Sequence, residues 1–191
     1  MNAIETSQIE IFLQAVNYDT KYRILDIGGG GEGIISKLYG DKVVAIDLRE
    51  DELIEIADEK SLKIVMDAAD LSFIDNQFDK VTIFFSLMYM DDDIISKVIE
   101  ESKRVLKPKG KIEIWDIEIP SKSEVQEDVF IAQLKVKLEN SLIETGYGVG
   151  LKGCRRDVDF YKEVFLDNNL LLLKESVGDK GQFYFLLEKR A

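Results

Sequence analysis

The chain contains no histidine and only one cysteine, Cys154, among its 191 residues. The lack of histidine excludes a mechanism that relies on an imidazole base. A single cysteine excludes an internal disulfide. Arg155 and Arg156 follow Cys154 and could favour a thiolate, but a lone cysteine is more often packed or tolerated, and we interpret it in that way.

The sequence has no apolar run long enough to span a membrane, and its first residues, MNAIETSQIE, lack the basic and apolar pattern of a signal peptide. Hydrophobic residues make up 46% of the chain, which argues against disorder. We therefore expect a single domain over residues 1–191, no association with membranes and a cytoplasmic location.

Negative charge dominates, with 37 acidic against 25 basic residues and a net charge of -12 at pH 7. Such a surface repels polyanions unless a basic patch compensates. The densest basic clusters lie within 103–111, where a helix is expected to end and its dipole favours cations, and within 152–156. Nucleic acid is therefore a disfavoured partner, and a small molecule is easier to accommodate.

The stretch from Ile24 to Asp47, ILDIGGGGEGIISKLYGDKVVAID, has the order strand, glycine turn, helix, strand, acid. Glycine adopts sharp turn angles at low cost and lets the backbone and the free N–H groups of a helix approach a ligand. Asp47 lies 19 residues after Gly28, near the usual spacing of about 20 for an acid that accepts hydrogen bonds from a ribose. The pattern indicates a nucleoside site.

Two interpretations of this site stay open. Gly28, Gly30 and Gly33 satisfy the dinucleotide fingerprint, so an NAD-linked oxidoreductase is one of them. Asp26, just before the turn, would instead repel a pyrophosphate and attract a cation. Asp67 also ends an apolar segment, LKIVMD. The second interpretation is therefore a ligand with a ribose, a ring amine and a positive charge, which acids at three strand ends favour.

Five motifs in order give the chain a family resemblance, namely Ile24–Gly33 (ILDIGGGGEG), Val43–Asp47 (VVAID), Met66–Phe78 (MDAADLSFIDNQF), Phe78–Met90 (FDKVTIFFSLMYM) and Val105–Trp115 (VLKPKGKIEIW). With these motifs the chain resembles the class I S-adenosylmethionine-dependent methyltransferases over about residues 20–116. A C-terminal pair of strands fits the same pattern.

The resemblance implies an α/β, Rossmann-like fold whose seven-stranded mixed sheet is mainly parallel, with an antiparallel last strand and flanking helices. It implies S-adenosylmethionine as cofactor and methyl transfer to a small-molecule acceptor. A non-catalytic S-adenosylmethionine-binding module is a further alternative. The cofactor-binding residues implied are Asp26, Gly28, Gly29, Gly30, Asp47, Leu48, Asp67, Ala68 and Ser86.

We divide the domain into four segments. Residues 1–18 contain a leading helix over 3–18, and residues 20–117 form the cofactor-binding core. Residues 118–160 are a substrate-side insertion, and residues 161–191 are a closing helix and strand pair. Within the core we expect a helix over 50–59, a turn at 107–110 and a strand over 111–117. Apolar and polar residues alternate in AQLKVKLE, which predicts a β-hairpin insertion near 128–149. This hairpin could serve as a lid or as an interface.

Catalytic residues are harder to assign, because methyl transfer needs alignment more than a strong base. Tyr89, Asp116, Glu118 and Tyr147 are candidates for proton removal, although the acids could be solvated and the tyrosines could be packed aromatic or turn residues. The segment SLMYM, from Ser86, lacks the Asn/Asp-Pro-Pro-aromatic pattern of relatives that methylate exocyclic amines of bases or glutamine, which argues against those substrates.

Asp91, Asp92 and Asp93 could suggest a divalent metal. They stand where the start of a helix favours acids, so we interpret them as helix-capping residues and expect no metal site.

Overall fold

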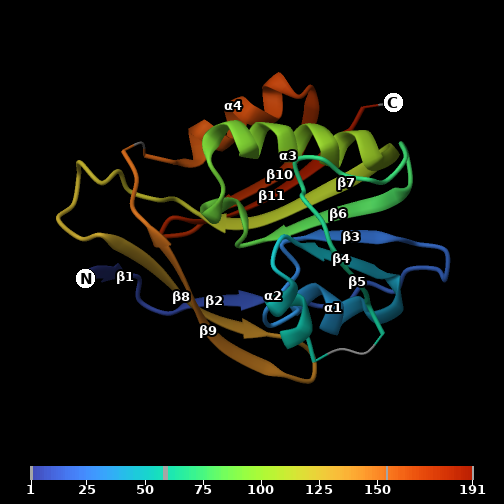
Figure 1. The fold of residues 1–191 in the computed structure, drawn as a ribbon, viewed down its shortest axis with the longest axis horizontal. Helices are drawn as coiled ribbons and strands as arrows, with labels where there is room; N and C mark the ends of the chain where they lie inside the picture. The colour runs from blue at the N-terminus through green and yellow to red at the C-terminus, as the bar shows by residue number, and fades with distance from the viewer. Residues whose placement is uncertain (1, 58–59, 154, 191) are drawn as a thin grey trace.

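A seven-stranded sheet forms the centre of the structure, which is a computed structural model that describes residues 2–57, 60–153 and 155–190 (Figure 1). The strand order is β10-β11-β7-β6-β3-β4-β5. The strands are β3 (Ile24–Ile27), β4 (Val43–Asp47), β5 (Leu62–Val65), β6 (Phe78–Phe84), β7 (Leu106–Ile117), β10 (Leu170–Val177) and β11 (Gln182–Lys189). Strands β3 to β7 run parallel, whereas β11 is antiparallel to β7 and β10. The predicted mixed sheet is confirmed.

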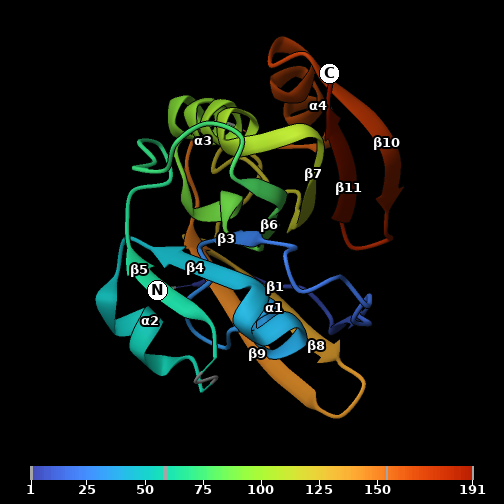
Figure 2. The same ribbon diagram turned by 90° about the vertical axis from the view of Figure 1, so that its right-hand side faces the viewer.

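Helices cover both faces of this sheet (Figures 1 and 2). The helices are α1 (Ile34–Tyr39), α2 (Glu50–Glu55), α3 (Asp92–Val105) and α4 (Val158–Asp167), and two short 3-10 helices are η1 (Gly40–Lys42) and η2 (Leu87–Tyr89). In α3, Ile95, Val98 and Ile99 recur at helical spacing and are fully buried against the sheet. Helix α4 lies on the same face of the sheet, and α1 and α2 lie on the other face (Figure 1).

A second, smaller sheet packs on the side of α1 and α2 (Figure 2). Strands β8 (Val129–Lys137) and β9 (Leu142–Gly150) form the antiparallel hairpin that was predicted near 128–149, which is confirmed. Alternate residues of β8 are buried, as the period of two requires. Their apolar side chains join those at the ends of β6 and β7 in one cluster.

The prediction of a leading helix over residues 3–18 is wrong. This segment forms strands β1 (Ala3–Glu5) and β2 (Ile9–Phe12), which pair in parallel with successive parts of β8. Strand β9 pairs with one edge of β8 along the whole length of β8. Strands β1 and β2 therefore share the other edge of β8. The β-branched residues Ile9 and Ile11 alternate with polar neighbours, and the open edge of β8 supplies the backbone hydrogen bonds that a strand needs.

Two further expectations differ in their boundaries. Helix α2 ends at Glu55, before the end expected at residue 59, and residues 58 and 59 lie outside the described part, as does Cys154. The turn expected at 107–110 falls within an irregular start of β7, where the register with β6 shifts. Lys109 there has a φ of 63°, so the chain turns as expected while it remains part of the strand.

In the described ranges, no helix is long and apolar enough to cross a membrane.

Replacement of Ile9 by alanine tests the corrected N-terminal structure. Ile9 is completely buried in β2, so Ile9→Ala is expected to lower the free energy of unfolding by about 2–5 kcal/mol. Urea unfolding followed by circular dichroism measures this change. Ile54→Ala is the matched control, because that side chain is 73% exposed and its loss should change stability by no more than about 0.5 kcal/mol. Equal stabilities of the two variants would contradict the packing of β2.

Candidate functional site

The glycine turn follows β3 at the carboxyl edge of the main sheet and leads into α1. Gly28 and Gly31 have φ angles of 64° and 60°, a region in which other residues are strained. The N–H of Gly29 donates a hydrogen bond of 3.0 Å to the carbonyl of Ile46 in β4. The turn is therefore fixed against the neighbouring strand, next to the point where the chain order of the strands reverses between β3 and β6.

Side chains from neighbouring elements occupy the space that any side chain on Gly28 or Gly30 would need. A Cβ atom on Gly28 would lie 2.3 Å from the hydroxyl oxygen of Ser86, which follows β6. A Cβ atom on Gly30 would lie 2.5 Å from the Cβ of Glu52 in α2. These distances are far below van der Waals contact, so glycine is required at both positions. The turn thus brings β3, β6 and α2 together at one edge.

Asp26 is buried in β3 beneath this turn. One carboxylate oxygen accepts a hydrogen bond of 2.7 Å from the hydroxyl of Thr82 in β6. Burial raises the pKa of Asp26 to about 7; the Thr82 hydrogen bond opposes this effect, and the negative charge of Asp47 adds to it. A cation beside the turn would offset the burial and favour the charged form of Asp26.

The next two acids stand at neighbouring strand ends. Asp47 ends β4, and its side chain accepts a hydrogen bond of 2.9 Å from the N–H of Arg49. Asp67 follows β5 and accepts one of 2.8 Å from the N–H of Ala69. The N–H of Met66 donates to the carbonyl of Asp47 over 3.0 Å, so the structure brings the two acids to the same edge.

Two apolar residues accompany these acids. Leu48 is 68% exposed beside Asp47, whereas Ala68 is buried in the main core. The edge therefore offers carboxylates and an exposed apolar side chain within a few residues of one another. This combination fits a nucleoside, because the carboxylates can accept hydrogen bonds from hydroxyl and amine groups while the apolar surface covers a ring.

Asp116 is fully buried near the end of β7. One of its carboxylate oxygens accepts hydrogen bonds from the N–H groups of Leu87 at 2.9 Å and Met88 at 3.3 Å, and the other accepts from Ile117. Burial raises the pKa of this carboxyl to about 7, against the effect of these donors. The structure thus engages Asp116 in holding the η2 segment that follows Ser86.

Glu118 also has a local partner. One of its carboxylate oxygens accepts a hydrogen bond of 3.1 Å from the N–H of Val158 at the start of α4. Its role in this structure is to hold the beginning of that helix.

The β8–β9 hairpin contacts the glycine turn through Glu32. The phenol of Tyr147 in β9 donates a hydrogen bond of 2.7 Å to the Glu32 carboxylate, and the hydroxyl of Thr145 donates to its other oxygen. The ring of Tyr147 lies 5.8 Å from that of Phe85 after β6. The hairpin is therefore held against the edge that carries the turn. The alternation of residues 132–139 predicted the hairpin in which Tyr147 lies, but nothing in the sequence linked Tyr147 to Glu32.

Tyr89 and Tyr147 are the two tyrosines of this region. Tyr89 is 49% exposed, and burial of its hydroxyl together with nearby Asp116 raises its pKa to about 12. Burial and the Glu32 carboxylate raise the pKa of Tyr147 far above its ordinary value. Both phenols are consequently protonated at neutral pH, and that of Tyr147 already donates its hydrogen bond to Glu32.

The acids at the start of α3 pair with bases beyond the hairpin. Asp91 contacts Lys152, and Asp92 forms an ion pair of 2.7 Å with Arg156. Asp91 occupies the N-cap position, but its side chain makes no capping hydrogen bond. Within the described ranges, no group of three or more acidic or cysteine side chains is placed to hold a metal. These acids fasten the segment after the hairpin to α3.

Comparison with known proteins identifies the class of this domain. Residues 25–114 match the family model described as a methyltransferase domain. A solved S-adenosylmethionine-dependent methyltransferase from Methanosarcina mazei shares the fold, with a TM-score of 0.63 and 21% identity over 91% of this chain and 95% of that one. Residues 25–114 therefore match a methyltransferase domain, and the chain shares the fold of solved S-adenosylmethionine-dependent methyltransferases, as the motifs predicted.

Two sequence relatives extend this comparison. An uncharacterized protein of Methanocaldococcus jannaschii is 29% identical over 88% of this chain and 83% of its own length. A ubiquinone/menaquinone biosynthesis C-methyltransferase of Rickettsia typhi is 34% identical over 53% of this chain. The match covers 46% of that enzyme, so the chain spans about half of this relative's length. These findings favour the methyltransferase interpretation over an NAD-linked oxidoreductase.

The buried carboxyl of Asp26 predicts a specific dependence of stability on pH. Because its pKa is about 7 in the folded chain and near 3.9 when unfolded, the folded chain binds more protons between these values. The contribution of Asp26 to the free energy of unfolding is complete below about pH 4 and is lost as the pH rises through 7. The unfolding free energy of the native chain minus that of Asp26→Asn should fall by up to roughly 4 kcal/mol over this range. Urea titrations at several pH values measure it, and a constant difference would contradict the burial.

Removal of the Glu32 side chain tests the contact between turn and hairpin. Glu32→Ala leaves Tyr147 and Thr145 without their acceptor, so amide hydrogen exchange in residues 142–150 should accelerate by about tenfold or more. Mass spectrometry of peptides from β9 measures the rates. Glu139→Ala removes an exposed acid at the hairpin tip and should leave them unchanged. Equal exchange in both variants would show that Glu32 does not hold the hairpin.

Proposed function

We propose that this chain transfers a methyl group from S-adenosylmethionine to a small-molecule acceptor that binds between the glycine turn and the β8–β9 hairpin. The observation that carries the proposal is the meeting of the turn, the acids Asp26 and Asp47 and the residue Ser86 at one edge, with Tyr147 of the hairpin held beside them through Glu32. One group of residues can thus hold the cofactor while a separate element bounds the acceptor.

The proposed cofactor contacts follow from the chemistry of each residue. Asp47 would accept hydrogen bonds from the ribose hydroxyls, and Asp67 and Ala68 would hold the ring amine. Leu48, 68% exposed, supplies an apolar surface for the base. The backbone of Gly28, Gly29 and Gly30 permits the close approach, and Asp26 offers negative charge to the cationic part, with Ser86 at the neighbouring strand end.

When bound, S-adenosylmethionine supplies a methyl group on a positively charged sulfur, which is already activated for transfer. This chain then contributes alignment and exclusion of water rather than a strong base. The protonated phenol of Tyr89 is suited to hold the acceptor by a hydrogen bond, because a pKa of about 12 makes it a poor base near neutral pH. The phenol of Tyr147 already donates to Glu32, so Tyr147 would offer its ring to the acceptor. Asp116 acts in this scheme by positioning η2, since backbone N–H groups already occupy its oxygens.

The proposal assigns a part to each segment of a single domain. Residues 20–117 hold the cofactor, 118–160 face the acceptor, and 161–191 close the sheet. The two tyrosines favour an acceptor with a planar or apolar part. The net charge of -12 disfavours nucleic acid as the acceptor. A cytoplasmic location belongs to the same proposal, in keeping with a chain whose one cysteine allows no internal disulfide.

Replacement of Asp47 by alanine tests the proposed cofactor site. The loss of charge-assisted hydrogen bonds to the ribose should weaken the binding of S-adenosylhomocysteine by about 1.5–3 kcal/mol, roughly 10- to 150-fold. Isothermal titration calorimetry measures the affinity. Glu50→Ala removes an exposed acid from the adjacent helix and should bind the ligand as the native chain does.

Turnover completes this test. The native chain, Asp47→Ala and Glu50→Ala are each incubated with S-adenosylmethionine and a panel of small planar acceptors, and S-adenosylhomocysteine is measured by mass spectrometry. Acceptor-dependent product that decreases in Asp47→Ala supports the proposal. Equal affinity of the native chain and Asp47→Ala for the ligand would contradict the proposed site.

A further inference from the structure

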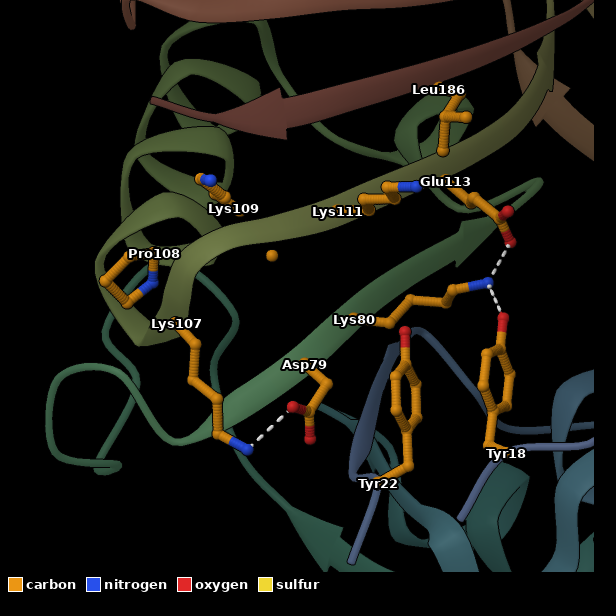
Figure 3. A pocket seen from close by; sticks show the side chains of 11 residues that line it. Tyr18, Tyr22, Asp79, Lys80, Lys107, Pro108, Lys109, Lys111, Glu113 and Leu186 are labelled. Carbon is orange, nitrogen blue, oxygen red and sulfur yellow. Dashed lines mark hydrogen bonds and ion pairs between the residues drawn. The ribbon is translucent and has the colours of Figure 1, made fainter. Parts of the chain in front are cut away.

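A cavity of about 300 Å³ lies at the edge of the main sheet opposite the glycine turn (Figure 3). Its walls come from the segment before β3, the first residues of β6 and the irregular start of β7. Parallel strands begin here, whereas the proposed cofactor site lies where they end. The cavity is therefore separate from the methyltransferase site, and its volume reaches the lower end of the range for small-molecule sites, about 300–1,000 Å³.

Lysines line one side of this cavity. Lys107 forms an ion pair of 2.7 Å with Asp79. Lys109 is exposed and Lys111 is half-buried. Among the residues that the structure describes, neither forms an ion pair within 4 Å, although Glu188 of β11 stands opposite Lys111 in the sheet. The dipole of α3 does not account for them, because that helix ends at Val105 and such effects fade within the last turn. The chain thus places two lysines that form no ion pair beside a cavity although its net charge is -12.

Two tyrosines form another wall. The rings of Tyr18 and Tyr22 stack with centroids 3.9 Å apart and an interplanar angle of 4°. In Figure 3 the ring of Tyr22 lies between Tyr18 and Asp79, on the side nearer to the lysines. The stack leaves this aromatic side chain next to the cavity, where a planar ring could pack against it.

A buried ion pair fixes the aromatic wall. The ammonium group of Lys80 donates hydrogen bonds to the hydroxyl of Tyr18 over 2.7 Å and to the carboxylate of Glu113 over 2.9 Å. The Lys80 side chain is only 4% exposed. The positive charge of Lys80 is paired with Glu113, so Lys80 holds the aromatic wall in place. Lys109 and Lys111 are then the charges available to a ligand.

We propose that this cavity binds a small phosphate monoester that carries a planar ring. The phosphate group, with a charge of about -1.5 to -2 at neutral pH, is attracted by the ammonium groups of Lys109 and Lys111, which form no ion pair within the described residues. Lysine is a compact point charge suited to phosphate. The ring of the ligand packs on Tyr22. This site is independent of the proposed methyl transfer and of the cofactor edge.

Phenyl phosphate is the probe that tests the site, titrated into the full chain by calorimetry at low salt. The double variant Lys109→Ala/Lys111→Ala should bind it about tenfold or more weakly than the native chain, because two charge-assisted contacts are lost. Lys97→Ala/Lys103→Ala is the matched control. It removes the same charge from α3, away from the cavity lining, and should change the affinity by less than about twofold.

A second variant separates the two parts of the ligand. Tyr22→Leu should weaken phenyl phosphate binding by about threefold to tenfold and leave the binding of inorganic phosphate unchanged, because only the ring contact is lost. Benzoate should bind more weakly than phenyl phosphate, since it carries a single charge. S-adenosylhomocysteine binding by every variant serves as the control for folding, and failure of the cofactor proposal would leave the comparison between phosphate ligands intact.

Three results would overturn the proposal. The first is that the native chain shows no heat with phenyl phosphate at millimolar concentrations. The second is that the lysine variant and its control lose affinity equally, which would show a general effect of net charge. The third is that inorganic phosphate binds as tightly as phenyl phosphate with no effect of Tyr22→Leu, which would contradict the role of the ring.

Discussion

The close packing of the glycine turn is the constraint on which the rest of the structure depends. Ser86 and Glu52 already fill the space that side chains on Gly28 and Gly30 would need, and a backbone hydrogen bond ties Gly29 to β4. A larger residue would push β6 or α2 away from the sheet edge. Because the turn is fixed by three elements, the acids that end the adjacent strands meet in one place.

Two buried carboxyl groups connect this edge to the rest of the domain. Burial of a carboxylate is costly unless hydrogen bonds or a cation compensate, and the pKa of both Asp26 and Asp116 rises to about 7. Asp26 lies beneath the turn, where a positively charged ligand would lower that cost. Asp116 instead accepts backbone hydrogen bonds from η2 and so fixes the segment that carries Tyr89. One acid thus lies beneath the glycine turn, and the other orders the segment that follows β6.

The parts of the fold that could be predicted are those whose signals lie close together in the sequence. The strand, turn, helix and acid between Ile24 and Asp47 are consecutive, and apolar runs marked the parallel strands. The N-terminal segment could not be assigned in the same way, since the isolated run around Ile9 fits a helix or a strand. What decides between them is the free edge of β8, more than a hundred residues away. The link between Glu32 and Tyr147 spans 115 residues and has no local signature either.

The account rests on one claim above all, that the edge built by the glycine turn holds S-adenosylmethionine. Calorimetric titration of the native chain with S-adenosylhomocysteine and, under the same conditions, with NADH tests it most directly. The account predicts saturable binding of S-adenosylhomocysteine at one site per chain and no binding of NADH, because the buried Asp26 disfavours a pyrophosphate beside the turn. Saturable binding of NADH without any binding of S-adenosylhomocysteine would contradict it.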